Sequence, residues 1–112
     1  MTLEQALHKA LEGGWGNVPP HTEFRSIAVE HDTIVLHVYD RQRRHRDYCT
    51  YSLGLALLDP LFWQALGGAL GWAEGVAPKY LVYQQWWIQP WHRFIEHLAH
   101  GGSIAAFFET LA

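Results

Sequence analysis

Hydrophobic residues recur at helical spacing at the start of the chain. A T-x-x-Q capping box, formed by Thr2 and Gln5, precedes them and predicts where the helix begins. Gly13-Gly14 then predicts where it ends. The apolar face of this helix consists of Leu3, Leu7, Ala10 and Leu11.

An alternating pattern follows and predicts strands at residues 24–30 and 33–40, on either side of His31-Asp32. A two-residue turn there fixes a register that puts the apolar side chains on one face. The expected pairs are Val29 with Ile34, Ile27 with Leu36, and Arg25 with Val38. Residues 47–53 predict a third antiparallel strand, with residues 41–46 as the connection.

The second half of the chain has helical patterns. Asp59 as the N-cap and Pro60 as the first helical residue predict one helix. A second is expected from Pro90 to Ala99, and Ser103 caps a third. Residues 79–89 are ambiguous between strand and helix. The apolar faces are Phe62, Leu66 and Leu70, then Trp91, Phe94, Ile95 and Leu98, then Ile104, Phe107, Phe108 and Leu111.

This order of elements predicts the α+β class. We expect residues 1–112 to form a single compact domain, in which helices pack on one face of a small three-stranded antiparallel meander.

Composition limits the classes of function. The 112 residues are 49% hydrophobic and carry a formal net charge of −3. Such a chain has enough apolar material to fold. Its charge argues against a protein that binds nucleic acid or anionic membranes over its whole surface. Any contact with a polyanion must therefore be local.

A single cysteine, Cys49, excludes an internal disulfide and is typical of a reducing, intracellular compartment. The N-terminus lacks the basic start and apolar run of a signal peptide. Residues 52–73 contain Asp59 as their only charge, but Asp59-Pro60 divides them. Neither half reaches the roughly 20 residues of a membrane helix. We expect a cytoplasmic protein with no membrane partner.

The stretch DRQRRHRDY, residues 40–48, is strongly basic. Guanidinium groups on a hairpin tip, close to aromatic rings, suit contact with nucleic acid. There are two alternatives. The first is a solvated turn whose arginines pair with Asp40 and Asp47, and it would favour a register with arginine beside aspartate. The second is contact with an acidic protein. The candidate contact residues are Arg41, Arg43, Arg44 and Arg46, with Tyr39, Tyr48 and Tyr51 nearby.

Six tryptophans are more than a core of this size needs. Tryptophan is enriched at binding hot spots, although core packing is its more frequent role. The candidates for a partner surface are Trp86, Trp87 and Trp91, with Trp63 and Trp72 as further members of an aromatic groove.

His92, Glu96 and His100 recur at intervals of four along the helix predicted after Pro90. Imidazole and carboxylate groups at this spacing can bind zinc. However, the first and last are roughly 12 Å apart along a helix, so one ion cannot take all three. Arg93 and His97 are expected on the same polar face, which favours an ordinary exposed surface. We expect no metal and no cofactor.

Cys49 and His37 lie on neighbouring predicted strands. One register sets them opposite each other as a thiolate–imidazole pair, and a slip of two residues places His37 opposite Tyr51 instead. A lone cysteine in a strand is more often a small buried hydrophobe. The sequence also has no P-loop, dinucleotide-binding, paired C-x-x-C or G-x-S-x-G motif. We predict no catalytic residues.

The second half of the chain has a recognisable order of features. A leucine-rich segment is followed by an aspartate, a phenylalanine and an alanine-leucine-glycine. A later amphipathic helix begins with tryptophan, and a short terminal helix contains FFETL. The residues are Leu57, Leu58, Asp59, Phe62, Ala65, Leu66 and Gly67, then Trp91, Ile95 and Leu98. This half resembles a loose family of small bacterial and phage or prophage proteins of unknown function. The chain has Asp59-Pro60-Leu61 where that family usually has histidine-aspartate, and it lacks the family's glutamines in the later helix. The resemblance implies a compact intracellular domain and transfers no catalytic residue.

Together these observations predict a non-catalytic binding or interaction module. Its aromatic surface would meet an unknown protein partner or a second copy of the chain. The alternative is a weak nucleic-acid binder that uses the hairpin Arg41–Arg46. An enzyme that depends on the Cys/His pair or on a metal is the third hypothesis.

Overall fold

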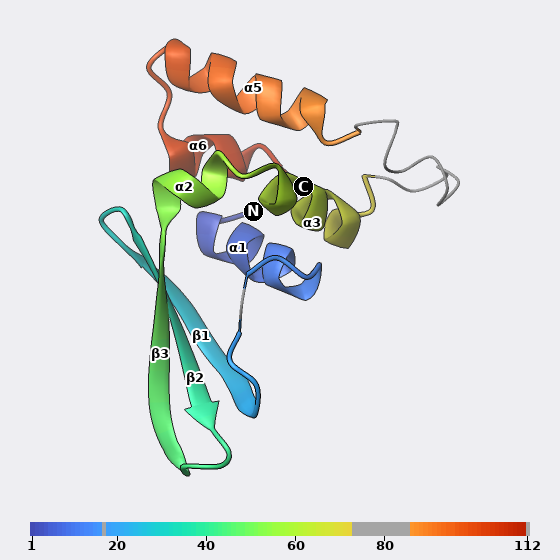
Figure 1. Cartoon of the computed structure of the whole chain (residues 1–112). Helices are drawn as coiled ribbons and strands as arrows, with labels where there is room; N and C mark the ends of the chain where they lie inside the picture. The colour runs from blue at the N-terminus through green and yellow to red at the C-terminus, as the bar shows by residue number, and fades with distance from the viewer. Residues whose placement is uncertain (17, 73–85, 112) are drawn as a thin grey trace. The chain divides into compact units, whose positions relative to one another are not determined.

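The computed structural model describes residues 1–16, 18–72 and 86–111. The elements are α1 (Leu3–Glu12), β1 (Thr22–Glu30), β2 (Thr33–Asp40), β3 (His45–Ser52), α2 (Leu53–Leu57), α3 (Pro60–Leu70), α5 (Ile88–Ala99) and α6 (Ile104–Glu109) (Figure 1). The α+β prediction is confirmed: a helix, a three-stranded antiparallel meander and a helical C-terminal half. Two compact units make up the chain, a meander unit of Gly16–Asp59 and a helical unit of Met1–Trp15 with Pro60–Ala112.

The meander unit has the strand order β1-β2-β3, and both neighbouring pairs are antiparallel. The turn at His31-Asp32 sets Val29 opposite Ile34, as predicted. His31 adopts a left-handed φ of 55°, which lets the chain reverse within two residues. The fully buried side chains of the central strand are Ile34, Leu36 and Val38.

A β-bulge interrupts the register between Phe24 and Ser26. The alternating pattern predicted Arg25 opposite Val38, and this was wrong because Phe24 takes that place. Arg25 is the extra residue and has no partner on β2. Phe24 and Ile27 face the same side although they are three positions apart, and a regular strand cannot satisfy that spacing without an inserted residue.

The third strand begins at His45, two residues before its predicted start, so the β2–β3 loop is Arg41–Arg44. Helix α2 follows β3 directly and was not predicted, because five residues are too few to show a helical period. The hydroxyl of Ser52 accepts a hydrogen bond from the amide of Leu55 at 3.3 Å and caps this short helix.

The helical unit begins at the predicted capping box. The hydroxyl of Thr2 accepts from the amide of Gln5 at 3.1 Å, and the side-chain oxygen of Gln5 accepts from the amide of Thr2 at 2.8 Å. The end of α1 passes very close to α3. A methyl group at Gly13 would lie 2.8 Å from the carbonyl carbon of Ala65, so only glycine fits this approach without a shift.

The core of the helical unit is built around Trp63, which is fully buried. Its ring stacks on that of Phe108, with centroids 6.0 Å apart and an interplanar angle of 14°. Further ring contacts come from Phe62, Phe94 and Phe107. Removing so large a side chain from such a site costs about 3–5 kcal/mol.

Two helices complete the described part of the helical unit. Helix α5 begins at Ile88 rather than at the predicted Pro90, and α6 is capped by Ser103 as predicted. Most of the ambiguous run 79–89 lies outside the described residues. Among the residues that are described, no helix combines the length and the apolar character needed to cross a bilayer.

Candidate functional site

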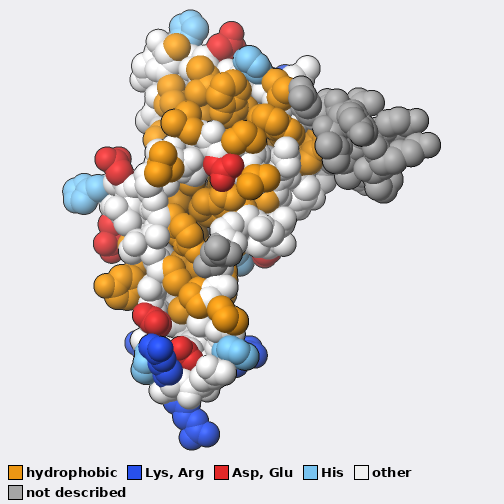
Figure 2. Space-filling view, in the orientation of Figure 1, with side chains coloured by type: hydrophobic (Ala, Val, Ile, Leu, Met, Phe, Trp, Pro, Cys, Tyr) orange, Lys and Arg blue, Asp and Glu red, His pale blue; other side chains and the backbone are white. Residues whose placement is uncertain are grey.

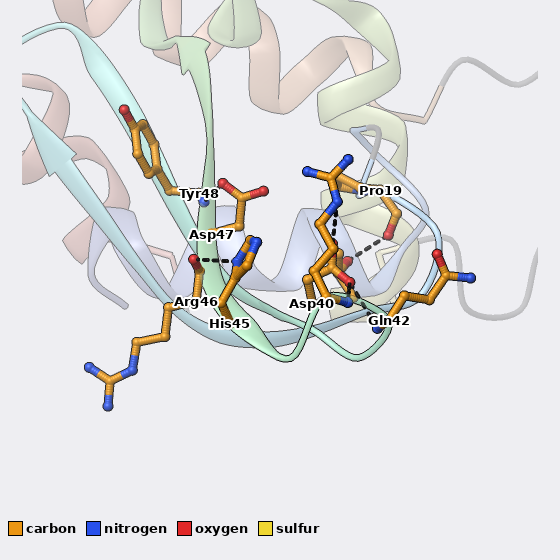
Figure 3. A network of polar contacts seen from close by, with 9 residues as sticks. Pro19, Asp40, Gln42, His45, Arg46, Asp47 and Tyr48 are labelled. Atoms are coloured by element: carbon orange, nitrogen blue, oxygen red, sulfur yellow. Dashed lines mark hydrogen bonds and ion pairs between the residues drawn. The ribbon is translucent and has the colours of Figure 1, made fainter.

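The β2–β3 loop is held in shape by Asp40. Its carboxylate accepts hydrogen bonds from the backbone amides of Gln42 at 2.9 Å and Arg43 at 3.0 Å (Figure 3). These hydrogen bonds, that from Arg43 above all, hold the pKa of Asp40 below its ordinary value of 3.8. Arg44 closes the loop with a left-handed φ of 56°. The loop therefore presents its arginines from a defined backbone conformation.

The arginines of this hairpin differ in their ion pairs. Arg41 lies 3.7 Å from Glu23, and Arg43 lies 4.0 Å from Asp40. Both guanidinium groups are exposed, although the side chain of Asp40 is only 16% exposed. Ion pairs at the surface contribute only about 0–1 kcal/mol, so the guanidinium groups can exchange partners. Arg44 and Arg46 make no ion pair with any residue in the described part of the chain.

Positive charge concentrates at this end of the meander unit. Residues 22–26 and 37–48 contain five arginines and three carboxylates, a net charge of +2 in a chain whose total is −3. Figure 2 shows the blue Lys and Arg side chains gathered at the tip that carries the β2–β3 loop. The predicted local basic patch is therefore present as a surface.

The alternative in which the hairpin arginines pair with aspartates holds for Asp40, which pairs with Arg43 within the loop at 4.0 Å, but not across the strands. Asp40 lies opposite His45, and Asp47 lies opposite Val38, so neither faces an arginine across the ladder. Only the register of this alternative was wrong, because the loop closes at Arg44 and sets the strands in a register that places no arginine opposite an aspartate.

One face of the sheet combines aromatic and cationic side chains. The ladder pairs Tyr39 with Arg46 and His37 with Tyr48, and paired residues project to the same face. In Figure 3 the side chains of Arg46 and Tyr48 lie on the same side of β3, and that of Asp47 points away from them. We call this set, together with Arg25, the tyrosine–arginine face.

The bulge in β1 brings Arg25 to this face. Its guanidinium carbon lies 5.2 Å from the centroid of the Tyr39 ring, a cation–π contact. An open depression of about 660 Å³ is lined by residues that include Arg25, His37, Tyr39 and Arg46, together with the acidic Asp47. Tyr48, opposite His37, leaves 64% of its surface exposed. To an anionic, aromatic ligand the face thus offers a planar cation in Arg25, which also pairs with Glu23 at 3.8 Å, and an open ring in Tyr48. Arg44 and Arg46 lie nearby and pair with no carboxylate among the described residues.

Sequence reasoning identified the hairpin arginines and noted the tyrosines, but it missed Arg25. A signal for it was present: the step from Phe24 to Ile27 breaks the alternation of apolar residues, and such a break indicates a bulge that re-aims a side chain. Tyr51 lies opposite Ile34, on the other face of the sheet, and so does not join the other two tyrosines.

The thiolate–imidazole pair is not formed. Cys49 lies opposite Leu36, and His37 lies opposite Tyr48, so the two side chains project to opposite faces. Both predicted registers were wrong, again because the loop closes at Arg44. Burial, and after it the nearby charge of Asp47, raises the pKa of the Cys49 thiol above 9.0, which disfavours the reactive thiolate.

Helix α5 carries the metal candidates His92, Glu96 and His100, all of which are exposed. The ring of His100 lies 2.8 Å from the backbone carbonyl of Glu96. Throughout the described ranges, no three His, Cys, Asp or Glu side chains come together in a group that could hold a metal ion.

His97 is half-buried, whereas the other members of the predicted polar face, His92, Arg93, Glu96 and His100, are exposed. Its Nε2 lies 2.7 Å from the carbonyl oxygen of Ser103, and its ring centroid lies 5.7 Å from that of Phe107. The turn between α5 and α6 folds back over the imidazole, which a pattern within one helix cannot reveal.

The tryptophans proposed as a partner surface, Trp86, Trp87 and Trp91, are half-buried. The rings of Trp86 and Trp72 pack against Gly67 of α3, where an added methyl group would overlap Trp86 and lie 2.7 Å from Trp72. Trp86 therefore takes part in packing the helical unit. Contact of these residues with a partner stays a prediction.

Comparison with known proteins finds no matching family, no matching curated protein and no matching solved structure. The resemblance of the second half to small bacterial and phage proteins stays a prediction. The function is therefore inferred from the geometry of the tyrosine–arginine face and its hairpin.

Proposed function

We propose that the protein is a non-catalytic, cytoplasmic nucleic-acid-binding module that contacts phosphates with the arginines of its β2–β3 hairpin. The observation that carries this proposal is the exposure of Arg44 and Arg46 without an ion pair to any described residue. Arginine is the side chain best suited to phosphate because its planar fork donates two parallel hydrogen bonds.

The local charge supports the same function. A net charge of +2 at the hairpin end attracts phosphates to one place, while the overall charge of −3 opposes binding elsewhere on the protein. Asp40 and Glu23 provide alternative partners for Arg43 and Arg41 in the free protein. Exchange of these partners for phosphates costs little, since ion pairs of exposed guanidinium groups contribute about 0–1 kcal/mol and Asp40 keeps its hydrogen bonds from the loop amides when Arg43 leaves it.

The number of arginines sets the expected dependence on salt. Each phosphate contact with a single strand changes the logarithm of the binding constant by about −0.7 per tenfold increase in salt. Four hairpin arginines then give a slope of about −2.8, which weakens binding about 50-fold between roughly 50 and 200 mM salt.

The test is fluorescence anisotropy of a labelled oligonucleotide titrated with protein at several salt concentrations. The variant Arg44→Ala with Arg46→Ala should bind more weakly, and its slope should fall to about −1.4. The matched control is Lys9→Ala with Arg93→Ala, which removes two positive charges from the helical unit instead. Anisotropy is the suitable readout because all six tryptophans lie outside residues 16–59.

The absence of binding by the parent protein at low salt would refute the proposal. Equal losses in the two double variants would also refute it, because they would show that total charge rather than the hairpin controls binding. In either case the tryptophan surface and a protein partner become the leading hypothesis.

A further inference from the structure

We infer that the nucleic acid is bound as a single strand, with a base stacked on Tyr48 while Arg46 contacts a neighbouring phosphate. This inference rests on the proposed phosphate contact of the hairpin and adds the class of substrate. It identifies the tyrosine–arginine face as the surface that receives the bases.

Tyr48 is suited to stacking because its ring is open to solvent. The side chain belongs to an edge strand and is 64% exposed. Large aromatic rings more often bury most of their surface against neighbouring side chains. Its backbone is fixed on both sides: it pairs with His37 across the ladder, and its amide donates to the carboxylate of Asp47 at 2.8 Å. A base that stacks on this ring covers apolar surface that water now contacts.

Tyr39 and Arg25 provide a second planar group. Tyr39 is the diagonal neighbour of Tyr48 on the same face, and diagonal pairs lie roughly 7–8 Å apart. The guanidinium of Arg25 lies over the Tyr39 ring at 5.2 Å from its centroid. Guanidinium planes, like aromatic rings, stack on unpaired bases. Two successive bases of one strand can therefore meet two planar groups on this face.

The charges are placed to hold the backbone of such a strand. Arg46 comes two residues before Tyr48 on the same face of β3, closer to the loop, and lies opposite Tyr39. Arg44 precedes them at the end of the loop. A nucleic-acid strand that runs across the face toward the loop thus passes first over the planar groups and then over Arg46 and Arg44. Neither of these arginines makes an ion pair with a described residue. The side chain of Asp47 leaves β3 on the other side from those of Arg46 and Tyr48 (Figure 3), and its carboxylate is engaged by the backbone amide of Tyr48 at 2.8 Å.

This geometry favours a single strand over a duplex. The bases of a duplex are stacked on one another and expose only their edges, whereas the bases of a single strand can turn their faces to aromatic side chains. Stacking does not read hydrogen-bonding edges, so we expect little dependence on base sequence.

The test compares three probes: a labelled single-stranded oligonucleotide, the same oligonucleotide annealed to its complement, and inorganic polyphosphate as a competitor without bases. The variants are Tyr48→Ile, which removes the ring and suits a strand, and Tyr48→Phe, which keeps the ring. We expect Tyr48→Ile to weaken single-strand binding at least about fivefold. Tyr48→Phe should bind like the parent, and both variants should bind polyphosphate as the parent does.

Two different failures can be distinguished. If the duplex binds as tightly as the single strand and Tyr48→Ile has no effect, the stacking inference falls and the phosphate contact stands. If none of the three probes binds at low salt, the proposed function itself falls, and the stacking inference with it. Circular dichroism of both tyrosine variants should match the parent, because Tyr48 is exposed and makes no contribution to a core.

Discussion

Replacement of Gly13 by alanine tests the closest approach in the helical unit. Gly13 is the C-cap of α1, and its φ of −78° suits any L residue, so alanine meets no conformational strain. The difficulty is space. The new methyl group would overlap the carbonyl oxygen of Ala65 and lie 3.0 Å from its Cα. These are backbone atoms of α3, so no change of rotamer can relieve the overlap.

The expected cost combines two opposing effects. Loss of glycine restricts the unfolded chain and favours folding by about 0.4–1 kcal/mol. Restoring ordinary contact of about 3.5 Å from 2.8 Å at the carbonyl carbon alone would require α1 and α3 to separate by about 0.7 Å, and the nearer carbonyl oxygen requires more than that. Overpacking of this kind costs about 1–3 kcal/mol. We therefore expect the free energy of unfolding to fall by about 1–2 kcal/mol.

Urea unfolding followed by circular dichroism measures this change. With a slope of about 2 kcal/mol per molar urea, the midpoint should fall by about 0.5–1 M. The control is Gly68→Ala, in the interior of α3, where an added methyl group meets nothing within 4 Å. That variant should gain about 0.5–1 kcal/mol from its helix propensity. If Gly13→Ala raises the midpoint as Gly68→Ala does, the close packing of α1 on α3 is refuted.

Four further predictions concern single side chains. Trp63→Ala should lower the free energy of unfolding by about 3–5 kcal/mol in the same urea titration, and Trp63→Phe by clearly less; equal, small effects would contradict a central role in the core. Thr2→Ala should cost about 1 kcal/mol through loss of the capping box, and an unchanged midpoint would show that the cap is dispensable. Cys49 should react with iodoacetamide at neutral pH more slowly than free cysteine does, because the pKa of its thiol is raised. The substitution Asp47→Asn should speed the reaction, since it removes a nearby negative charge. A parent protein that reacts as fast as free cysteine would contradict the burial of the thiol. Ionised Asp40 should stabilise the hairpin fully above the pKa of the unfolded state, and this stabilisation should be lost as the pH falls through the lower pKa of the folded state. An NMR titration of this carboxyl should therefore have its midpoint below 3.8. A midpoint above that value would contradict the hydrogen bonds from the loop amides.

The sequence was informative where the structure depends on neighbours along the chain. The capping box at Thr2, the turn at His31-Asp32 and the start of α3 at Pro60 all involve contacts within a few residues. Residue type then nearly determines geometry, because side-chain caps and restricted backbones act locally.

The parts that could not be predicted depend on a single backbone conformation or on contacts between elements. Arg44 adopts a left-handed φ of 56°, a role that the sequence would signal with glycine or asparagine, and this residue sets the register of β3. That register decides which side chains share the face with Tyr39 and separates Cys49 from His37. The candidate site was therefore located by its arginines, while its arrangement required the structure.

The helical unit is interrupted along the chain, and this determines the order in which its parts can meet during synthesis. Gly13 and Ala65 lie 52 positions apart, whereas the strands of the meander are joined by short loops. Local hairpins close quickly, while distant contacts wait for the intervening chain. At about 5–20 residues per second, the ribosome delivers α3 about 3–10 s after α1. Throughout that time the apolar face of α1, which includes Leu3, Ala6 and Leu7, has no α3 to cover it. A nascent-chain chaperone that binds short apolar segments can therefore bind this face before α3 covers it.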